Sequence, residues 1–136
     1  MPCVVLVVDD TDLCREVACK LVSTLGYRSL GADCGTSAIA LIKNVSAEDR
    51  VVLLTDYFLP DANGLELCRL AKTLTGGATI LCSGDPEMIE ELSRDDGMID
   101  AVLEKPYSFG ELRNVLEYAV TSVLHLRTGV SAVETR

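Results

Sequence analysis

The most constraining feature of this sequence is a series of short apolar runs, each followed by a residue with a charged or hydroxyl side chain. Runs of this length are typical of parallel strands that are buried on both faces. In an open parallel sheet, ligands bind at the carboxyl ends of the strands. We therefore expect the residues that follow four of these runs to meet at one site. They are Asp9 and Asp10, Asp56, Ser83, and Lys105.

Segments of strand character alternate with segments of helix character five times along the chain. The expected strands cover residues 3–8, 28–32, 51–55, 78–82 and 100–104, of which 28–32 has the weakest pattern. The expected helices cover residues 12–25, 35–44, 64–74, 86–94 and 108–126. Such alternation implies right-handed crossovers and a parallel sheet with helices on both faces.

Two of the expected helices carry a clear apolar stripe. In the first, the apolar residues recur every four positions, at Leu13, Val17, Leu21 and Leu25. In the last, we expect five residues to point toward the core: Leu112, Leu116, Ala119, Val123 and Leu126. This spacing predicts that each helix packs one face on the sheet. Thr11 or Asp12 can cap the first helix, and Gly26 can end it.

Size and composition favour a single globular domain. The 136 residues fit one domain, over residues 1–126, with a polar tail at 127–136. Apolar residues make up 49% and aromatic residues only 4%, without tryptophan, so the core should be aliphatic. The net charge of −9 disfavours binding to nucleic acid or to an anionic membrane. No signal peptide and no membrane span is recognised, so we expect a cytoplasmic protein.

The six cysteines are expected to be reduced and buried. They lie at positions 3, 14, 19, 34, 68 and 82, without a CxxC pair that would indicate a zinc or thioredoxin-type site. Cys3 and Cys82 fall in expected strands, and Cys14, Cys19 and Cys68 fall in expected helices. A reducing compartment and the behaviour of a small apolar residue fit this distribution.

Three aspartates at one site require something that offsets their charge. Two carboxylates about 4 Å apart repel each other by about 4 kcal/mol at an effective dielectric constant of about 20. A proton is one answer, and Mg²⁺ is another, because it prefers hard oxygen ligands and also binds phosphoryl oxygens. An aspartate beside such an ion can act as a nucleophile and form an aspartyl phosphate. Lys105 and Ser83 would then hold the phosphoryl group.

Each of these residues also has an ordinary structural interpretation. Asp9 and Asp10 can be acids at the positive end of a helix. Asp56 and Ser83 can be turn residues, and a lone Lys105 is usually solvated. Because chance would rarely place all five at strand ends, their conjunction favours a functional site.

Four segments of the chain resemble the receiver domain of two-component response regulators. They are Leu6–Asp10, Leu54–Leu67, Ile80–Gly84 and Leu103–Tyr107, and the resemblance covers residues 3–122. It implies a chemotaxis-regulator-like α/β fold, a flavodoxin-like (βα)5 three-layer sandwich. The implied parallel sheet has five strands in the order 2-1-3-4-5.

The resemblance also assigns roles to individual residues. Asp56 matches the phosphoacceptor, and Asp10, Asp56 and the backbone carbonyl of Phe58 match direct Mg²⁺ ligands. Asp9 matches the acid that acts on the metal through a bound water. Ser83 matches the switch hydroxyl, and Lys105 matches the lysine that contacts the phosphoryl group. A cis peptide bond is implied between Lys105 and Pro106.

One departure concerns the way the signal is read. The aromatic switch residue of the family lies three residues before the lysine, where this chain has Val102. The coupled rotation of hydroxyl and ring therefore cannot operate in its usual form. Tyr107 lies beyond the lysine, where it can pack or take part in recognition. Phe58 and Asp85 match positions that tune dephosphorylation in the family.

The implied function is that of a phosphoacceptor signalling protein, not an enzyme, which assists its own phosphorylation and autodephosphorylation. The implied donor is a histidine kinase or a histidine phosphotransfer protein. A downstream protein would bind the face formed by the fourth helix, fifth strand and fifth helix. Whether the protein forms a homodimer is left open.

Other functions remain as alternatives. A haloacid dehalogenase-type phosphatase would need an acid where Phe58 stands, and a flavodoxin-like carrier would place a flavin phosphate against Asp9 and Asp10. A pseudo-receiver that binds partners without phosphorylation is the principal rival, although the acids and the lysine are intact. The chain could also be a receiver fragment of a hybrid histidine kinase. Met1, just before the first strand, and the tail favour a stand-alone protein.

Overall fold

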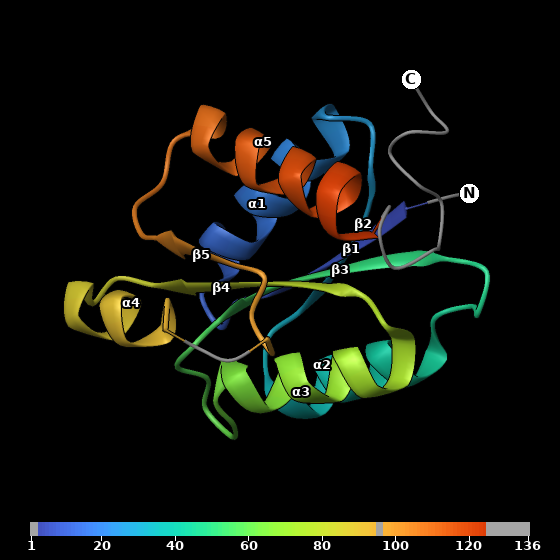
Figure 1. The fold of residues 1–136 in the computed structure, drawn as a ribbon, viewed down its shortest axis with the longest axis horizontal. Helices are drawn as coiled ribbons and strands as arrows, with labels where there is room; N and C mark the ends of the chain where they lie inside the picture. Colours follow the sequence, from blue (N-terminus) through green and yellow to red (C-terminus); the bar gives the residue numbers. More distant parts are fainter. Residues whose placement is uncertain (1–2, 95–96, 125–136) are drawn as a thin grey trace.

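A parallel sheet of five strands forms the centre of the protein (Figure 1). The computed structural model describes residues 3–94 and 97–124. The strands are β1 (Cys3–Val8), β2 (Arg28–Ala32), β3 (Arg50–Asp56), β4 (Ala78–Ser83) and β5 (Ala101–Glu104). Their order is β2-β1-β3-β4-β5, which confirms the fold class and the strand order that the resemblance implied.

Helices cover both faces of the sheet. They are α1 (Asp12–Thr24), α2 (Gly35–Asn44), α3 (Gly64–Thr75), α4 (Pro86–Leu92) and α5 (Phe109–Tyr118). In Figure 1, α1 and α5 lie above the sheet, whereas α2 and α3 lie below it. A π-helical segment, η1 (Ala119–Leu124), continues α5, so the long final helix of the sequence prediction changes its winding near its end. Leu126 and residues 127–136 lie outside the described residues.

The core is aliphatic, as the composition predicted, and is divided by the sheet into two clusters. Neighbouring strand residues alternate between them: Val5 and Val7 face α1 and α5, whereas Val4 and Leu6 face α2 and α3. The side chains of β1, β3 and β4 are almost all buried because both faces of the sheet carry helices, whereas the edge strands β2 and β5 are only partly buried. The sheet is therefore held rigidly, and so are the residues at the carboxyl ends of its strands.

The apolar stripe on α1 is only partly used for the core, contrary to the sequence prediction. Leu13 is 68% exposed and Val17 is 49% exposed, whereas Ala18 and Val22 are buried. Ala18 and Val22 carry the buried face of α1, so the helix is rotated relative to the predicted stripe. The stripe at Leu13 and Val17 is thus a surface feature.

Specific caps begin the helices that follow β3, β4 and β5. The side chain of Asn63 accepts a hydrogen bond from the Glu66 amide at the start of α3. Asp85 caps α4, which begins at Pro86 as the sequence predicted. Ser108 and Glu111 form a reciprocal capping box on α5. These caps fix where each loop at the carboxyl edge of the sheet ends.

At α1 the expected cap is weaker. Thr11 occupies the N-cap position of α1, but its side chain makes no capping hydrogen bond. At the other end of the helix, Gly26 adopts a positive φ of 94° just after the last turn, where glycine carries little strain. Gly26 therefore ends α1 as predicted, whereas the start of α1 lacks a side-chain cap at Thr11.

All six cysteines are free thiols, and Cys68 and Cys82 are buried. Cys14 is exposed on α1, so the expectation of burial is wrong for this residue. Leu13 and Val17 of the same helix are exposed as well. None of the helices in the described ranges combines the length and apolar content that a membrane crossing requires.

Candidate phosphoacceptor site

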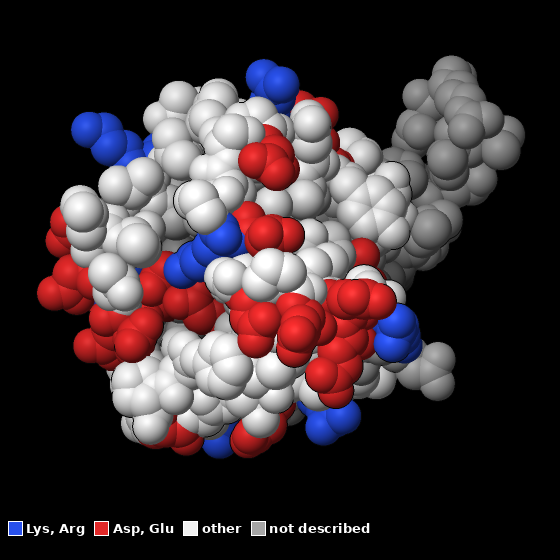
Figure 2. Space-filling model, turned by 90° about the vertical axis from the view of Figure 1, so that its left-hand side faces the viewer, with Lys and Arg blue, Asp and Glu red and all other residues white. Residues whose placement is uncertain are grey.

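The carboxyl ends of the strands form a strongly acidic edge of the molecule. This edge lies at the left of Figure 1 and faces the viewer in Figure 2. In Figure 2 acidic residues cover much more of the surface than basic residues do. A cation that approaches this edge is therefore attracted electrostatically.

Three of the predicted site residues are joined directly by an ion-pair bridge. The Nζ atom of Lys105 lies 2.7 Å from Asp9 Oδ2 and 2.8 Å from Asp56 Oδ1. Asp9 follows β1, Asp56 ends β3, and Lys105 follows β5, so the bridge spans strands that are distant in sequence. Their convergence is the geometry that the strand-end argument predicted.

The fourth residue, Asp10, completes a cluster of carboxylates. One carboxylate oxygen from each of Asp9, Asp10 and Asp56 lies within 4.8 Å of the others. Asp9 is buried, Asp56 is half-buried and Asp10 is exposed, so the cluster opens to solvent on the side of Asp10. Oxygen donors with an open side suit Mg²⁺, which keeps several waters when it binds protein. The residues present thus fit that ion.

The chain fixes Asp9 from several directions. The backbone amide of Thr11 donates to Asp9 Oδ1 at 2.9 Å, and Arg15 Nη1 donates to the Asp9 carbonyl at 2.9 Å. The Asp9 amide donates to the Ala32 carbonyl of β2 at 3.1 Å. Side-chain and backbone contacts together fix Asp9 just before α1, and they leave Asp9 Oδ2 for Lys105.

Burial and neighbouring charges shift the pKa values in the bridge. Burial raises the pKa of Asp56 to about 7, although the hydrogen bond from Lys105 acts to lower it. For Lys105, burial lowers the pKa, but the bonds to Asp56 and Asp9 outweigh this effect and raise it. Lys105 is therefore a permanent cation at neutral pH, and the Asp56 carboxylate lies in surroundings that favour added positive charge.

Ser83 lies at the same edge but is turned toward a different partner. Its backbone carbonyl accepts a hydrogen bond from the Lys105 amide at 2.9 Å, which extends the pairing of β4 with β5. Its buried hydroxyl accepts a hydrogen bond from the Asp85 amide at 3.1 Å. The hydroxyl is thus engaged with the residue that caps α4.

Phe58 belongs to a small hairpin between β3 and α3. It forms an antiparallel bridge with Asn63, and the Leu59 amide donates to the Ala62 carbonyl at 3.2 Å. The Phe58 ring is 62% exposed and makes an edge-to-face contact with Tyr57. The Phe58 side chain therefore lies largely at the surface.

The peptide bond between Lys105 and Pro106 is cis, as the resemblance implied. Tyr107 packs partly buried against the cluster that contains Leu112 and Leu116, which supports a packing role. Val102 is partly buried and packs against the other cluster, together with Met88 and Ile99. The position of the usual switch aromatic is thus filled by a small aliphatic side chain that joins α4 to β5.

The family model of the response regulator receiver domain matches residues 5–117. The chain belongs to the response regulator receiver family. It is 34% identical over 113 residues to the response regulator MprA of Mycobacterium sp., covering 82% of this chain and 48% of MprA. It is 30% identical over 112 residues to the autoinducer 1 sensor kinase/phosphatase LuxN of Vibrio campbellii, covering 82% of this chain and 13% of LuxN. The chain spans less than half the length of either relative.

The fold is also similar to that of solved receiver domains. One is the receiver domain of the sensor histidine kinase PA1611 from Pseudomonas aeruginosa PAO1, whose structure has a magnesium ion coordinated in the active site cleft. The TM-score is 0.73 and the identity 21%, over 90% of this chain and 100% of that domain. At this identity the likeness shows the fold.

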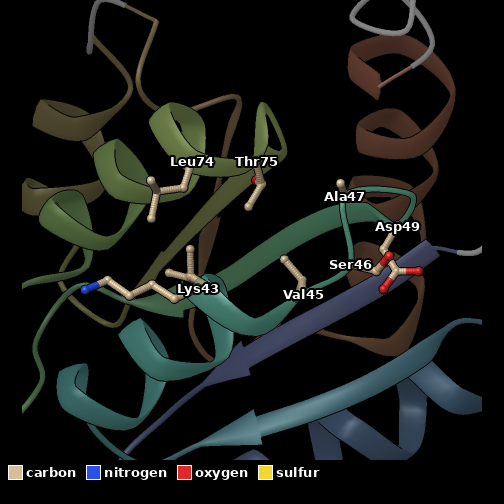
Figure 3. A pocket seen from close by; sticks show the side chains of 8 residues that line it. Lys43, Val45, Ser46, Ala47, Asp49, Leu74 and Thr75 are labelled. Carbon is tan, nitrogen blue, oxygen red and sulfur yellow. The ribbon is translucent and has the colours of Figure 1, made fainter.

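A hollow of the described surface lies away from the acidic edge. A cavity of about 510 Å³ lies at the opposite end of the sheet, where α2 and α3 end. In Figure 3 Leu74 and Thr75 lie on one side of it, and Lys43 and Val45 lie on the other. Because it is far from the strand ends that carry the acids, the cavity plays no part in the site.

Two residues that contribute to this edge were missed by the sequence analysis. Arg15 lies one helical turn beyond Thr11, a spacing that could have placed it near the strand end. Asp61 lies in the hairpin after β3 and contacts Gly35 and Thr36 of α2. No periodicity or motif in the sequence signals a partner 26 residues away.

Proposed function

We propose that the protein is a cytoplasmic phosphoacceptor whose Asp56 receives a phosphoryl group from a histidine kinase or a histidine phosphotransfer protein. The observation that carries this proposal is the bridge from Lys105 to Asp9 and Asp56, at 2.7 and 2.8 Å. A fixed cation beside a carboxylate nucleophile offsets the charge that an incoming phosphoryl group brings.

Mg²⁺ would bind to Asp10, Asp56 and the backbone carbonyl of Phe58, and to Asp9 through a water. The cluster of three carboxylates supports this assignment, since its oxygens lie within 4.8 Å of one another. A bound Mg²⁺ would neutralise charge on the phosphoryl oxygens and help to orient them. The side chains of the protein carry out the transfer step itself.

In the transfer step, a carboxylate oxygen of Asp56 attacks phosphorus in line with the bond to the donor nitrogen. The new O–P bond forms an acyl phosphate, and the N–P bond breaks with its electron pair left on the histidine ring. Lys105 keeps its protons and contacts the phosphoryl oxygens. Asp9 holds Lys105 in place through the bond between Oδ2 and Nζ.

An apolar surface beside the site supports a protein donor. Leu13 and Val17 of α1, together with Pro106 and Tyr107, line a largely apolar hollow of about 430 Å³ that Lys105 also borders. Exposed apolar groups beside a charged reaction centre are typical of a protein interface. We propose that the phosphodonor docks here and presents its phosphohistidine to Asp56.

The signal would leave the site through Ser83. A phosphoryl group on Asp56 offers charged acceptors to the Ser83 hydroxyl, which now accepts a hydrogen bond from the Asp85 amide. When the hydroxyl turns toward the phosphoryl group, the cap of α4 loses that contact. With Val102 at the place of the usual ring, α4 itself would be the moving part that a target protein reads on the α4–β5–α5 face.

Incubation with a small phosphodonor and Mg²⁺ tests the proposal. Intact-mass spectrometry should detect the addition of one phosphoryl group to the wild type and none to Asp56→Asn at the same time point. Asp33→Asn, which removes an exposed acid that is not a member of the carboxylate cluster, is the matched control and should react like the wild type. Equal labelling of Asp56→Asn would refute Asp56 as the nucleophile.

A Mg²⁺ titration of the same protein distinguishes a phosphoacceptor from a pseudo-receiver. A Mg²⁺ titration followed by the fluorescence of Tyr57, which neighbours Asp56, should give a saturating signal in the wild type. A pseudo-receiver would give no response to the metal and would gain no mass from the donor. Both negative results together would leave only a binding module with this fold.

A further inference from the structure

The hairpin that carries Phe58 is tied at its tip to a distant helix. Asp61 Oδ1 accepts a hydrogen bond from the Gly35 amide at 2.6 Å, and Asp61 Oδ2 accepts one from the Thr36 amide at 3.0 Å. The Thr36 hydroxyl donates a further bond to Asp61 Oδ2 at 2.7 Å. One carboxylate therefore holds three donors at the start of α2.

Asp61 takes the place of a cap that α2 lacks. The N-cap residue of α2 is Cys34, whose side chain makes no capping hydrogen bond. A carboxylate at a helix N-terminus satisfies free amides and lies in the positive field of the helix. The cap is supplied from 26 residues away, so it also joins two loops at the same edge of the sheet.

The contact between hairpin and helix is close enough to require glycine. A Cβ atom at Gly35 would lie 2.7 Å from Ala62 Cβ and 2.9 Å from Asp61 Oδ1. Real side chains do not approach so closely, so any larger residue at position 35 would push the hairpin away. Gly35 and Asp61 are therefore the two partners of one close contact between the helix and the hairpin.

This contact restrains the backbone of Phe58. The bridge between Phe58 and Asn63 and the turn from Leu59 to Ala62 make the hairpin a short unit with Asp61 at its tip. The base of the hairpin is fixed where the Gly64 amide donates to the Tyr57 carbonyl at 2.7 Å. Anchoring at both ends leaves the Phe58 carbonyl with little freedom.

We propose that Asp61 is a positioning residue for the metal site: by anchoring the hairpin tip to α2, it holds the Phe58 carbonyl ready for Mg²⁺. The inference rests on the proposed function, in which that carbonyl is a ligand. A ligand that is already in place need not be ordered when the ion binds, so the anchor increases metal affinity.

Calorimetric titration of the full chain with Mg²⁺ tests the inference. Asp61→Ala should weaken Mg²⁺ binding by roughly two- to thirtyfold, the range expected if the cost of losing a helix cap reaches the metal site. Asp61→Asn keeps an acceptor oxygen and should give an intermediate affinity. Asp33→Ala removes the same charge from the loop before α2 and should bind Mg²⁺ as the wild type does.

A role in positioning predicts a particular pattern in the kinetics. With a small phosphodonor, Asp61→Ala should need more Mg²⁺ for half-maximal labelling but reach nearly the wild-type rate at saturation. Gly35→Ala disturbs the same contact from the side of α2 and should shift the Mg²⁺ requirement in the same direction. It provides a second test if Asp61→Ala folds poorly by circular dichroism.

The possible failures are distinct. If Asp61→Ala and Gly35→Ala are less stable to urea but bind Mg²⁺ as tightly as the wild type, Asp61 is a structural cap only and the inference is wrong. If the wild type itself binds no Mg²⁺, the proposed function is refuted, and the inference with it. If Asp33→Ala weakens Mg²⁺ binding as much as Asp61→Ala does, the effect comes from net charge alone. That result would also overturn the inference.

Discussion

The hydroxyl of Ser83 accepts a hydrogen bond from the backbone amide of Asp85 at 3.1 Å. Ser83 ends β4 and Asp85 caps α4, so a single contact joins the edge of the acidic site to the start of the next helix. Rotation of this hydroxyl would therefore break a contact at the start of α4.

Replacement of Ser83 should separate phosphorylation from its readout. Ser83→Ala removes one hydrogen bond to the phosphoryl group and should slow labelling by a small phosphodonor by about tenfold or less. Beryllofluoride with Mg²⁺ should shift the amide resonances of α4 in the wild type and much less in Ser83→Ala. Ser83→Thr keeps the hydroxyl and serves as the control. Full α4 shifts in Ser83→Ala would exclude the hydroxyl as the link.

Replacement of Lys105 should increase Mg²⁺ affinity while it abolishes labelling. The ammonium occupies carboxylate oxygens of Asp9 and Asp56, so it competes with a metal for the same acids. Without Mg²⁺, Lys105→Met leaves those acids unpaired and should lower the free energy of unfolding by about 1–3 kcal/mol. Urea unfolding without Mg²⁺ measures the loss of stability, and its change with added Mg²⁺ measures the metal affinity.

A second lysine provides the matched control for this experiment. Lys72 Nζ lies 2.5 Å from Asp100 Oδ2 in a buried ion pair at the opposite end of the sheet. Lys72→Met should also destabilise the protein, but it should leave Mg²⁺ affinity and labelling unchanged. If Lys105→Met bound Mg²⁺ more weakly than the wild type, competition between the ammonium and the metal would be disproved.

The anchor at Asp61 should depend on pH in the acidic range. Hydrogen bonds from the Thr36 hydroxyl and from the Gly35 and Thr36 amides lower the pKa of this carboxyl below its ordinary value of 3.8. A carboxyl with a lower pKa in the folded protein stabilises the fold above the unfolded pKa, and this contribution is lost as the pH falls through the folded-state pKa.

The wild type should therefore exceed Asp61→Ala in urea midpoint at about pH 6, and the difference should shrink below about pH 4. Urea unfolding of both proteins across this range is the measurement, with Asp33→Ala as the control for loss of charge alone. A difference that widened on acidification would contradict the bonding pattern at Asp61.

The apolar surface on α1 should matter to protein donors only. Val17→Asp places a charge in the hollow beside Pro106 and Tyr107 and should slow transfer from a phosphorylated histidine phosphotransfer protein by about tenfold. The donor is chosen from a panel as the one that labels the wild type fastest. Labelling by a small phosphodonor should not change, because Val17 lies outside the carboxylate cluster.

Leu74→Asp is the control for this prediction. Leu74 is half-exposed at the other end of the molecule, so its replacement changes the same kind of side chain away from the site. It should accept phosphoryl groups from both donors as the wild type does. Equal loss of protein-donor transfer in Leu74→Asp would remove α1 as the docking surface.

The sequence was sufficient for the features that follow from strands and their ends. The apolar runs before Asp9 and Asp56 are buried strands, the run before Lys105 is a partly buried edge strand, and the rule for parallel sheets brings these residues together. Helix α2 begins and ends as predicted, at Gly35 and Asn44. These features are local or follow from topology, so a pattern in the chain can encode them.

Features that depend on how surfaces meet were not accessible in this way. The stripe with Leu13 and Val17 has helical spacing, but spacing alone does not tell that α1 packs on the sheet through Ala18 and Val22 instead. The bonds from Gly35 and Thr36 to Asp61 join turns whose sequences carry no mark of one another. The hydroxyl of Ser83 was placed at the right edge, but its bond to Asp85 depends on a rotamer.

The bridge from Lys105 to Asp9 and Asp56 has a consequence for the resting protein in a cell whose magnesium supply varies. The acids carry their own counter-cation within the fold, so, with Mg²⁺ bound as proposed, scarcity of the metal should stop phosphorylation without unfolding the protein. The Lys105 ammonium would thus maintain the fold, whereas Mg²⁺ would control phosphorylation.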